Sequence, residues 1–168
     1  MSRILGIDPG FGRTGIGIVE MRGGEAIYVA HTVIETPAED TFSDRLVSLR
    51  DALRRIIMEY TPDVAAVESL FFQTNVKTAM KVSMARGVVL LTIAEMKIDL
   101  VELTPNQVKH GIAGWGGADK KQVQGMVTRL LHLTAIPTPD DAADALALAI
   151  VGGFAARSPQ YVTPSTTT

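Results

Sequence analysis

Four acidic side chains stand beside apolar segments, at positions where a folded chain could bring them together. Asp8 and Glu68 each follow directly on a short apolar run that is typical of a buried strand. Asp141 and Asp144 lie near the start of an apolar C-terminal segment, and their i, i+3 spacing puts both on one face of a helix. A buried carboxylate without a partner is costly, and several carboxylates together repel one another. A hard divalent cation with oxygen ligands would relieve both problems, so these residues predict a metal site.

The chemistry that such a site predicts is hydrolysis of a phosphodiester bond. Mg²⁺ suits a site built from a few carboxylates and a substrate phosphate, and Mn²⁺ accepts the same oxygen ligands. Two such ions ~4 Å apart would activate a water molecule, hold the scissile phosphate and stabilise the leaving oxygen. No covalent intermediate with the protein is needed.

A purely structural interpretation of the acids is the alternative. An Asp after a strand often only forms a turn, and an Asp at a helix start commonly caps the helix or interacts with its dipole. For Asp140, which precedes the pair, we favour that structural role. Caps and turns explain Asp144 and Glu68 poorly, because Asp144 lies one turn inside an apolar helix and Glu68 lies between the apolar Val67 and Leu70.

The composition fits one globular domain and excludes several classes of protein. The 168 residues are 46% hydrophobic and contain no cysteine, which excludes disulfides, thiol nucleophiles and cysteine-bound zinc. The formal net charge of −2 argues against a general nucleic-acid coat, which would be strongly basic. It is weaker evidence against a nuclease, because a carboxylate cluster lowers the net charge while its metal restores a positive site.

The chain shows no sign of a membrane span or a signal peptide. Its start is charged at Arg3, too early for the apolar region of a signal peptide. The uncharged stretches 87–94 and 145–156 fall short of the ~20 residues that cross a bilayer. A chain without cysteine suits a reducing compartment, and we expect it in the cytoplasm.

Apolar periodicity and turn residues predict alternating helices and strands, and hence an α/β fold. The expected strands are 3–8, 15–21, 26–35, 64–67 and 99–103. The expected helices are 43–60, 75–98, 106–112, 119–133 and 140–156. Residues 1–156 therefore form one domain, and residues 157–168, which lack an apolar pattern, are expected to be a disordered tail.

The predicted strand order would gather the acids at one edge of the sheet. The first three strands should form an antiparallel meander, and the later strands, each preceded by a helix, should join the first strand in parallel. If the strands that end at Asp8 and Glu68 are neighbours, both carboxylates lie beyond the carboxyl ends of the strands. Ligands in open α/β sheets bind there.

Several segments, in this order along the chain, resemble the RuvC family of crossover junction endodeoxyribonucleases. The segments that carry the resemblance most clearly are 4–10 (ILGIDPG), 67–68 (VE) and 141–147 (DAADALA). It also includes the stretches 85–87, 108–109 and 120–123. The resemblance extends from residue 3 to about residue 152.

The resemblance implies a fold, an activity and a set of partners. The fold would be ribonuclease-H-like, with a mixed five-stranded sheet and helices on both faces. The family's four acidic positions fall on Asp8, Glu68, Asp141 and Asp144, and Asp141 is the least constrained because some members carry His there. The protein would be a homodimer whose subunits each cut one strand of a four-way (Holliday) DNA junction in recombination and repair. A junction-binding protein and a branch-migration motor are the implied protein partners.

Two lysines join the acids as expected catalytic residues. Lys109 and Lys120 resemble family positions that face DNA near the cut. A lysine beside the scissile phosphate could offset the charge that develops there. The alternative for both is a solvated helix face, the commonest environment of a lysine.

Other side chains are expected to contact DNA. Phe71 and Phe72 could stack on unpaired bases, with Phe71 favoured by the resemblance, although either could instead pack in the core. Gln73 and Asn75 are expected to contact the DNA backbone or bases. Sequence-independent contacts to phosphates are expected from Lys77, Lys81, Arg86 and Lys121. The apolar helix 75–98 could supply a dimer surface, with an ordinary core face as the alternative.

Four other functions compete with a junction nuclease. A nucleotide-binding interpretation of the GxGxxG match at 10–15 is disfavoured, because residues 16–19 are strand-like where a dinucleotide site needs a helix; those glycines better suit a tight turn and close phosphate approach. A phosphotransferase of the actin and sugar-kinase type is disfavoured, because it needs two domains around a nucleotide and 168 residues form one. Another ribonuclease-H-like nuclease acting on RNA, or a non-catalytic nucleic-acid-binding module, remains an alternative.

Overall fold

The computed structural model describes residues 1–69 and 76–165, and of residues 76–78 it describes the backbone alone. The strands are β1 Ser2–Asp8, β2 Arg13–Arg22, β3 Glu25–Glu35, β4 Val64–Glu68, β5 Asp99–Leu103 and β6 Val162–Thr163. The helices are α1 Phe42–Tyr60, α2 Val76–Glu95, α3 Pro105–Ala113, α4 Lys120–Leu130 and α5 Asp140–Ala155, followed by the short 3-10 turn η1 Pro159–Tyr161. Within the described ranges, no helix is both long and apolar enough to cross a membrane.

One mixed sheet with the order β3-β2-β1-β4-β5-β6 forms the centre of the molecule. The meander β1-β2-β3 is antiparallel, while β4 pairs in parallel with β1 and β5 pairs in parallel with β4, as the sequence predicts. The prediction of five strands was wrong, because β6 adds a sixth strand antiparallel to β5.

The sixth strand comes from the segment that was expected to be a disordered tail. In β6, Val162 pairs with Val101 and Thr163 pairs with Leu100, and η1 precedes it. The backbone amide of Ser165 also donates to the Asp99 carboxylate at 2.8 Å. Backbone hydrogen bonds to an exposed sheet edge order this segment. They need no apolar periodicity, so composition gave no signal for it.

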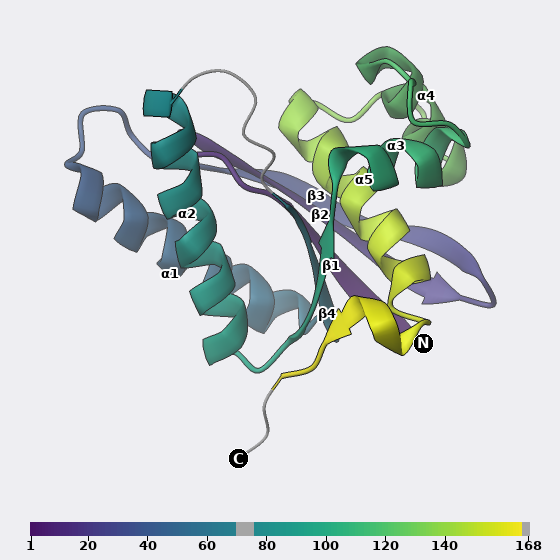
Figure 1. Cartoon of the computed structure of the whole chain (residues 1–168), viewed down its shortest axis with the longest axis horizontal. Helices are drawn as coiled ribbons and strands as arrows, with labels where there is room; N and C mark the ends of the chain where they lie inside the picture. The colour runs from purple at the N-terminus through teal and green to yellow at the C-terminus, as the bar shows by residue number, and fades with distance from the viewer. Residues whose placement is uncertain (70–75, 166–168) are drawn as a thin grey trace.

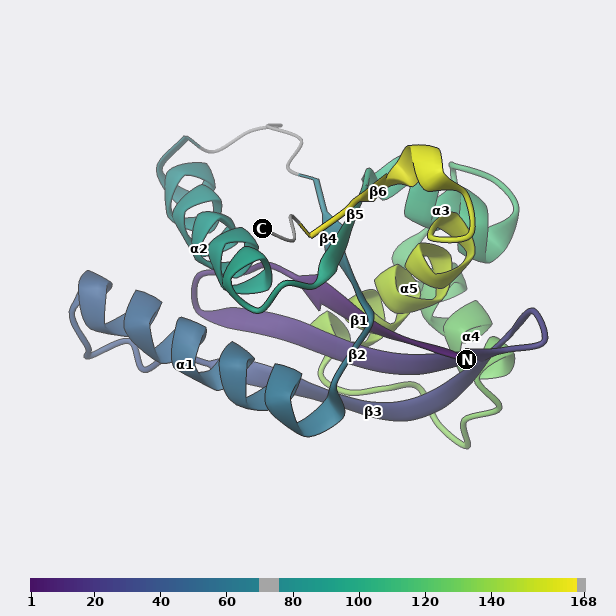
Figure 2. The same ribbon diagram turned by 90° about the horizontal axis from the view of Figure 1, so that it is seen from below.

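Helices cover the sheet on both faces, each over its own apolar core (Figure 1 and Figure 2). On one face α1 and α2 pack through Leu49, Leu53, Val89 and Ile93. On the other face α5 lies against the sheet, and α3 and α4 pack around it. The alternating faces of β1 and β4 supply apolar residues to both cores, as expected for central strands covered on both sides.

Helix α5 lies unusually close to the strands beneath it. A Cβ added to Gly6 of β1 would overlap the carbonyl oxygen of Ala145, and one added to Gly15 of β2 would overlap the carbonyl oxygen of Asp141. The sequence interpretation linked Gly15 to phosphate approach, but the structure shows that its missing side chain makes room for the helix. β2 begins at Arg13, inside the GxGxxG match at 10–15, so this match does not open a helix.

Candidate active site

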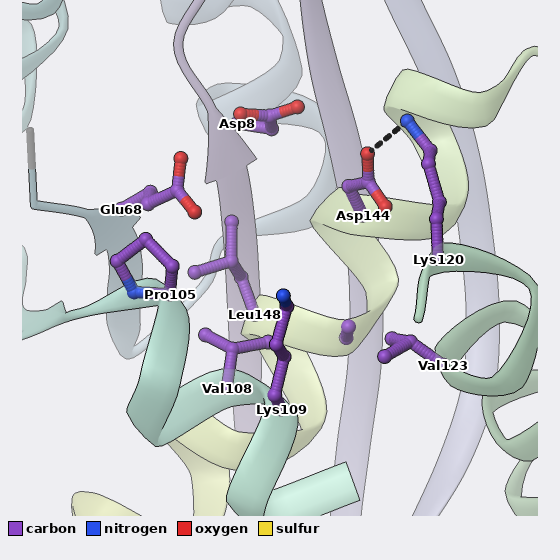
Figure 3. Close-up of a pocket in the computed structure, with 10 residues that line it drawn as sticks. Asp8, Glu68, Pro105, Val108, Lys109, Lys120, Val123, Asp144 and Leu148 are labelled. Atoms are coloured by element: carbon purple, nitrogen blue, oxygen red, sulfur yellow. Dashed lines mark ion pairs between the residues drawn. The ribbon is translucent and has the colours of Figure 1, made fainter. Parts of the chain in front are cut away.

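The ends of two parallel strands and one turn of α5 position three of the predicted acids. Ile7 of β1 pairs with Val67 of β4, so Asp8 and Glu68, the next residues, end neighbouring strands at the same edge of the sheet. Asp144 reaches this edge from α5. Figure 3 shows the three carboxylates around one cavity.

That cavity is a pocket of about 300 Å³ at the carboxyl ends of the strands. Its lining comes from β1, β4, α3, α4 and α5: Asp8, Glu68, Pro105, Val108, Lys109, Lys120, Val123, Asp144, Ala147 and Leu148. The floor is apolar and the charged groups stand around it, an arrangement that strengthens electrostatic interactions between them.

Asp8 is the most perturbed acid of the pocket. Its pKa is raised to about 7, first by burial and then by repulsion from Glu68, Asp144 and Asp141, while Lys120 acts in the opposite direction. A carboxyl with this pKa is about half protonated at neutral pH when nothing neutralises its neighbours. The site therefore favours a bound cation over four separate negative charges.

Glu68 and Asp144 are perturbed in the same direction for related reasons. Burial raises the pKa of Glu68, and the charge of Asp144 raises it further. Burial also raises the pKa of Asp144, although its hydrogen bond to Lys120 works in the opposite direction. The charge of each of these carboxylates therefore affects the pKa of its neighbours in the pocket.

Lys120 supplies a positive charge at the rim of the pocket. It is the first residue of α4 and follows the N-cap Asp119, which exchanges side-chain and backbone hydrogen bonds with Gln122 in a capping box. Its ammonium lies 2.7 Å from Asp140 Oδ2 and 2.9 Å from Asp144 Oδ2. Burial alone would lower the pKa of Lys120, but hydrogen bonds to Asp140 and Asp144 outweigh it and raise the pKa.

Lys109 also lines the pocket, from α3. Another capping box, formed by Thr104 and Gln107, fixes the start of that helix. The Lys109 ammonium points into the cavity between Glu68 and Asp144 (Figure 3), and no ion pair involves it among the described residues. The structure thus brings both predicted lysines to the predicted acids.

Asp141, the fourth predicted acid, lies beside the pocket rather than in its lining. Its Oδ2 is 3.4 Å from a guanidinium nitrogen of Arg13 on β2. In the part of the chain that the structure describes, no three His, Asp or Glu side chains are close enough to share one ion as they stand. Asp144 is turned toward Lys120 and Asp141 toward Arg13, so each carboxylate has a cationic partner.

The residues nevertheless fit a hard divalent cation. Asp8, Glu68 and Asp144 present only carboxylate oxygens to one cavity, which is the donor type that Mg²⁺ and Mn²⁺ prefer. Their raised pKa values show that the protein itself does not neutralise them fully. Side-chain rotation away from Lys120 and Arg13 would be required to bring all four to one ion or pair of ions.

The expected DNA contacts are only partly described. Phe71, Phe72, Gln73 and Asn75 lie outside the described residues, as does the side chain of Lys77. Lys121 is exposed on α4, and Lys81 is exposed on α2 with its ammonium 5.6 Å from the centre of the Phe11 ring. Arg86 is different, because it points inward to Glu68 and Glu102.

Sequence reasoning missed two charged residues of the site. Arg13 partners Asp141, and Asp140, which we had interpreted as a helix cap, is paired with Lys120. The side chain of Asp140 does lie at the start of α5, where backbone amides lower its pKa, but its hydrogen bond to Lys120 lowers it most. No signal in the sequence links residues 120 and 140, since only the packing of α4 against α5 brings them together.

Comparisons with known proteins agree with this geometry. A family model described as "Crossover junction endodeoxyribonuclease RuvC" matches residues 4–152. A crossover junction endodeoxyribonuclease RuvC from Thermosipho melanesiensis is 51% identical over 147 residues, which cover 88% of this chain and 94% of that protein. The residues matched by the family model include the positions of all four predicted acids.

Two solved structures of Thermus thermophilus RuvC have the same fold as this chain. One has a TM-score of 0.85 at 33% identity and covers 96% of this chain and 99% of its own. The other, in complex with Holliday junction substrate, has a TM-score of 0.90 at 32% identity and covers 98% of this chain and 99% of its own. The fold is therefore the ribonuclease-H-like fold of these resolvases, with a mixed sheet between helices.

Proposed function

The chain belongs to the RuvC family of crossover junction endodeoxyribonucleases, a hydrolytic and metal-dependent group, and we propose that its active site is the acidic pocket between β1, β4 and α5. The protein is a Holliday-junction-resolving nuclease of recombination and repair. The observation that carries the site proposal is that Asp8, Glu68 and Asp144 line one cavity together with two lysines.

Asp8, Glu68, Asp141 and Asp144 are the proposed ligands of two Mg²⁺ ions, which Mn²⁺ could replace. When bound, the ions would supply an activated water and neutralise charge on the scissile phosphate for in-line hydrolysis. The protein's own contribution is to hold the carboxylates on rigid strand ends and a closely packed helix. The rest of the pocket lining includes the apolar Val108, Val123, Ala147 and Leu148, which lower the polarity around the carboxylates.

Lys109 and Lys120 are proposed to face the cleaved DNA strand. Lys109 already points into the cavity, so its ammonium can approach a phosphate that enters there. Lys120 would exchange its carboxylate partners for the phosphate once a metal ion neutralises Asp144. Both would stabilise negative charge on the reacting phosphate group.

The wider DNA surface is proposed to include the exposed Lys81 and Lys121, together with Lys77, Gln73 and Asn75. Phe71 or Phe72 would stack on a base at the junction centre. The branched DNA itself is the expected ligand, because the related Thermus thermophilus structure is a complex with a Holliday junction.

We also propose a homodimer, with α2 as the contact surface. Met80, Met84 and Leu91 of this helix are 55%, 47% and 55% exposed, and their spacing puts them along one face. An apolar stripe of this kind indicates a contact with another protein surface. A second copy is the proposed occupant, because two cuts in one junction need two active sites.

A junction-binding protein and a branch-migration motor remain proposed partners by family resemblance. The cytoplasm remains the proposed location, since a nuclease of chromosomal recombination must reach that DNA.

The decisive test is cutting of a synthetic four-way junction and of linear duplex, each with Mg²⁺ and with chelator. We expect cutting of the junction only, and only with Mg²⁺. Asp8→Asn and Glu68→Gln should each lower the cutting rate at least ~10³-fold while junction binding in chelator stays within a few fold, because the ligands serve the ions rather than the DNA. Equal loss of binding and cutting in these variants would contradict the metal-ligand role.

A further inference from the structure

Arg86 of α2 points toward the sheet and reaches the ends of two strands. Its side chain is only 16% exposed, and its neighbours Ala85 and Val89 are buried in the core under α2. The guanidinium Nε donates to the backbone carbonyl oxygen of Glu68 at 3.0 Å. A terminal nitrogen of the same group pairs with the carboxylate of Glu102 on β5.

The peptide unit that follows Glu68 is therefore held at both ends. Arg86 binds its carbonyl oxygen, and its N–H, which belongs to Ser69, donates to the carbonyl oxygen of Leu103 at 2.8 Å. With both groups fixed, this peptide plane cannot rotate freely. The direction in which the Glu68 side chain leaves the backbone is fixed as well.

The arginine and the carboxylate approach this point from opposite faces of the sheet. Val67 lies opposite Glu102 and packs in the core under α2, whereas Glu68 lies opposite Leu103, which packs in the core under α5. Successive residues of a strand alternate between faces. The Glu68 side chain thus turns to the acidic pocket while Arg86 holds its main chain from the other side.

We infer that Arg86 is a positioning residue for Glu68, an inference that rests on the proposed metal-binding role of that glutamate. The planar guanidinium group of arginine has several N–H donors in a fixed geometry, so it can bind a backbone carbonyl and a carboxylate on a neighbouring strand at the same time. Groups that orient a metal ligand in this way typically change metal affinity or activity 10–100-fold when they are removed.

This role replaces the DNA-phosphate contact that the sequence suggested for Arg86. A phosphate contact needs free guanidinium donors at the surface, and here two of them have protein partners. Lys81, five residues earlier on α2, is exposed and is the better candidate for phosphate. The two roles differ in what they predict for metal and for DNA.

The test compares Arg86→Gln and Arg86→Lys with a matched control, Arg54→Gln. Arg54 of α1 forms an ion pair at 3.0 Å with Glu95, the last residue of α2, and no hydrogen bond in the described part of the chain joins it to Glu68 or Glu102. For each full-length variant, the measurements are the Mg²⁺ concentration that half-saturates junction cutting, the Mg²⁺-induced rise in Tm without DNA, and junction binding in chelator.

We expect Arg86→Gln to raise the half-saturating Mg²⁺ concentration about tenfold or more and to reduce the Mg²⁺-induced rise in Tm. Arg86→Lys should give an intermediate shift, because an ammonium cannot reproduce the fork. Junction binding in chelator should stay within about twofold, and Arg54→Gln should match the wild type in all three measurements.

If Arg86→Gln weakens junction binding but leaves the Mg²⁺ requirement unchanged, the inference is overturned and Arg86 instead contacts a DNA phosphate. If Arg86→Gln does not fold, Glu102→Gln keeps the arginine and removes its outer partner. A raised Mg²⁺ requirement in that variant supports the inference, and an unchanged one overturns it. Failure of the wild type to respond to Mg²⁺ would instead contradict the proposed function itself.

Discussion

The two faces of the sheet position the acids of the site in different ways. On the α5 face, helix and strands meet backbone to backbone at Gly6 and Gly15, which holds the main chain of α5 on either side of Asp144. On the α2 face, large side chains such as Leu53 and Ile93 separate the helices from the sheet, and Arg86 reaches through to Glu68. The main chain that carries one proposed ligand, Asp144, is therefore fixed where side chains are absent, and the main chain of the other, Glu68, is held by the long polar side chain of Arg86.

This difference shows how tolerant each face should be to substitution. A contact between two backbones cannot relax by a change of rotamer, whereas a layer of aliphatic side chains can repack around a small change in volume. A small substitution on the α5 face should therefore cause a large loss of unfolding free energy, whereas one on the α2 face should cause a small loss.

The largest effect is expected from Gly6→Val. The new side chain would overlap the carbonyl oxygen of Ala145 and the backbone of Ala149, so α5 would have to leave the sheet. We expect no stable fold, a loss beyond the ~1–3 kcal/mol of ordinary overpacking. Denaturant unfolding followed by circular dichroism measures it.

Gly125→Ala is the matched control, because a Cβ at this position in α4 meets open space. It should stabilise the protein by about 0.5–1 kcal/mol, since alanine is the better helix former. A folded Gly6→Val variant of near-normal stability would contradict the backbone contact.

A smaller effect, with a distinct pH dependence, is expected from Asp8→Asn in the metal-free protein. The folded-state pKa of Asp8, about 7, lies above its ordinary value near 3.8. Its stability contribution is therefore present below about pH 4 and is lost as the pH rises through 7. At pH 8 the variant should be more stable than the wild type by about 2–4 kcal/mol, since one pKa unit corresponds to ~1.4 kcal/mol.

The measurement is the unfolding free energy from pH 4 to pH 8, with and without Mg²⁺. The gain from Asp8→Asn should shrink toward zero at pH 4, and Mg²⁺ at pH 8 should stabilise the wild type far more than the variant. A gain in unfolding free energy that does not change with pH would contradict the raised pKa of Asp8 in the folded protein.

The smallest effect is expected from Ile93→Val on the α2 face. Ile93 is 2% exposed and packs among aliphatic side chains that can adjust. The loss should be about 0.5–1.5 kcal/mol in unfolding free energy, with cutting activity unchanged. A loss as severe as that of Gly6→Val would remove the contrast between the two faces.

Much of the fold follows from the sequence because its signals are local. The apolar runs before Asp8 and Glu68 predict strands, and the spacing of Leu49, Leu53 and Ile57 predicts α1. A helix precedes each later strand, which favours parallel pairing with the first strand. This gives the parallel pairing of β1 and β4, which brings the two acids together.

The parts that could not be predicted depend on contacts between distant segments. The pairing of Asp140 with Lys120 needs the packing of α4 on α5, and the inward turn of Arg86 needs the strand ends of β4 and β5 beneath α2. A lysine or arginine carries no local signal that distinguishes a phosphate contact from an internal partner. The ordered segment that includes β6 likewise depends on an edge of β5 that the sequence does not reveal.

Strand β6 has a practical consequence for anyone who shortens this protein. It covers the backbone groups of Leu100 and Val101 along the outer edge of the sheet. Removing residues 157–168 as a dispensable tail would uncover those groups and offer a pairing edge to other chains. A truncated protein of this kind should self-associate under conditions in which the full chain remains dispersed.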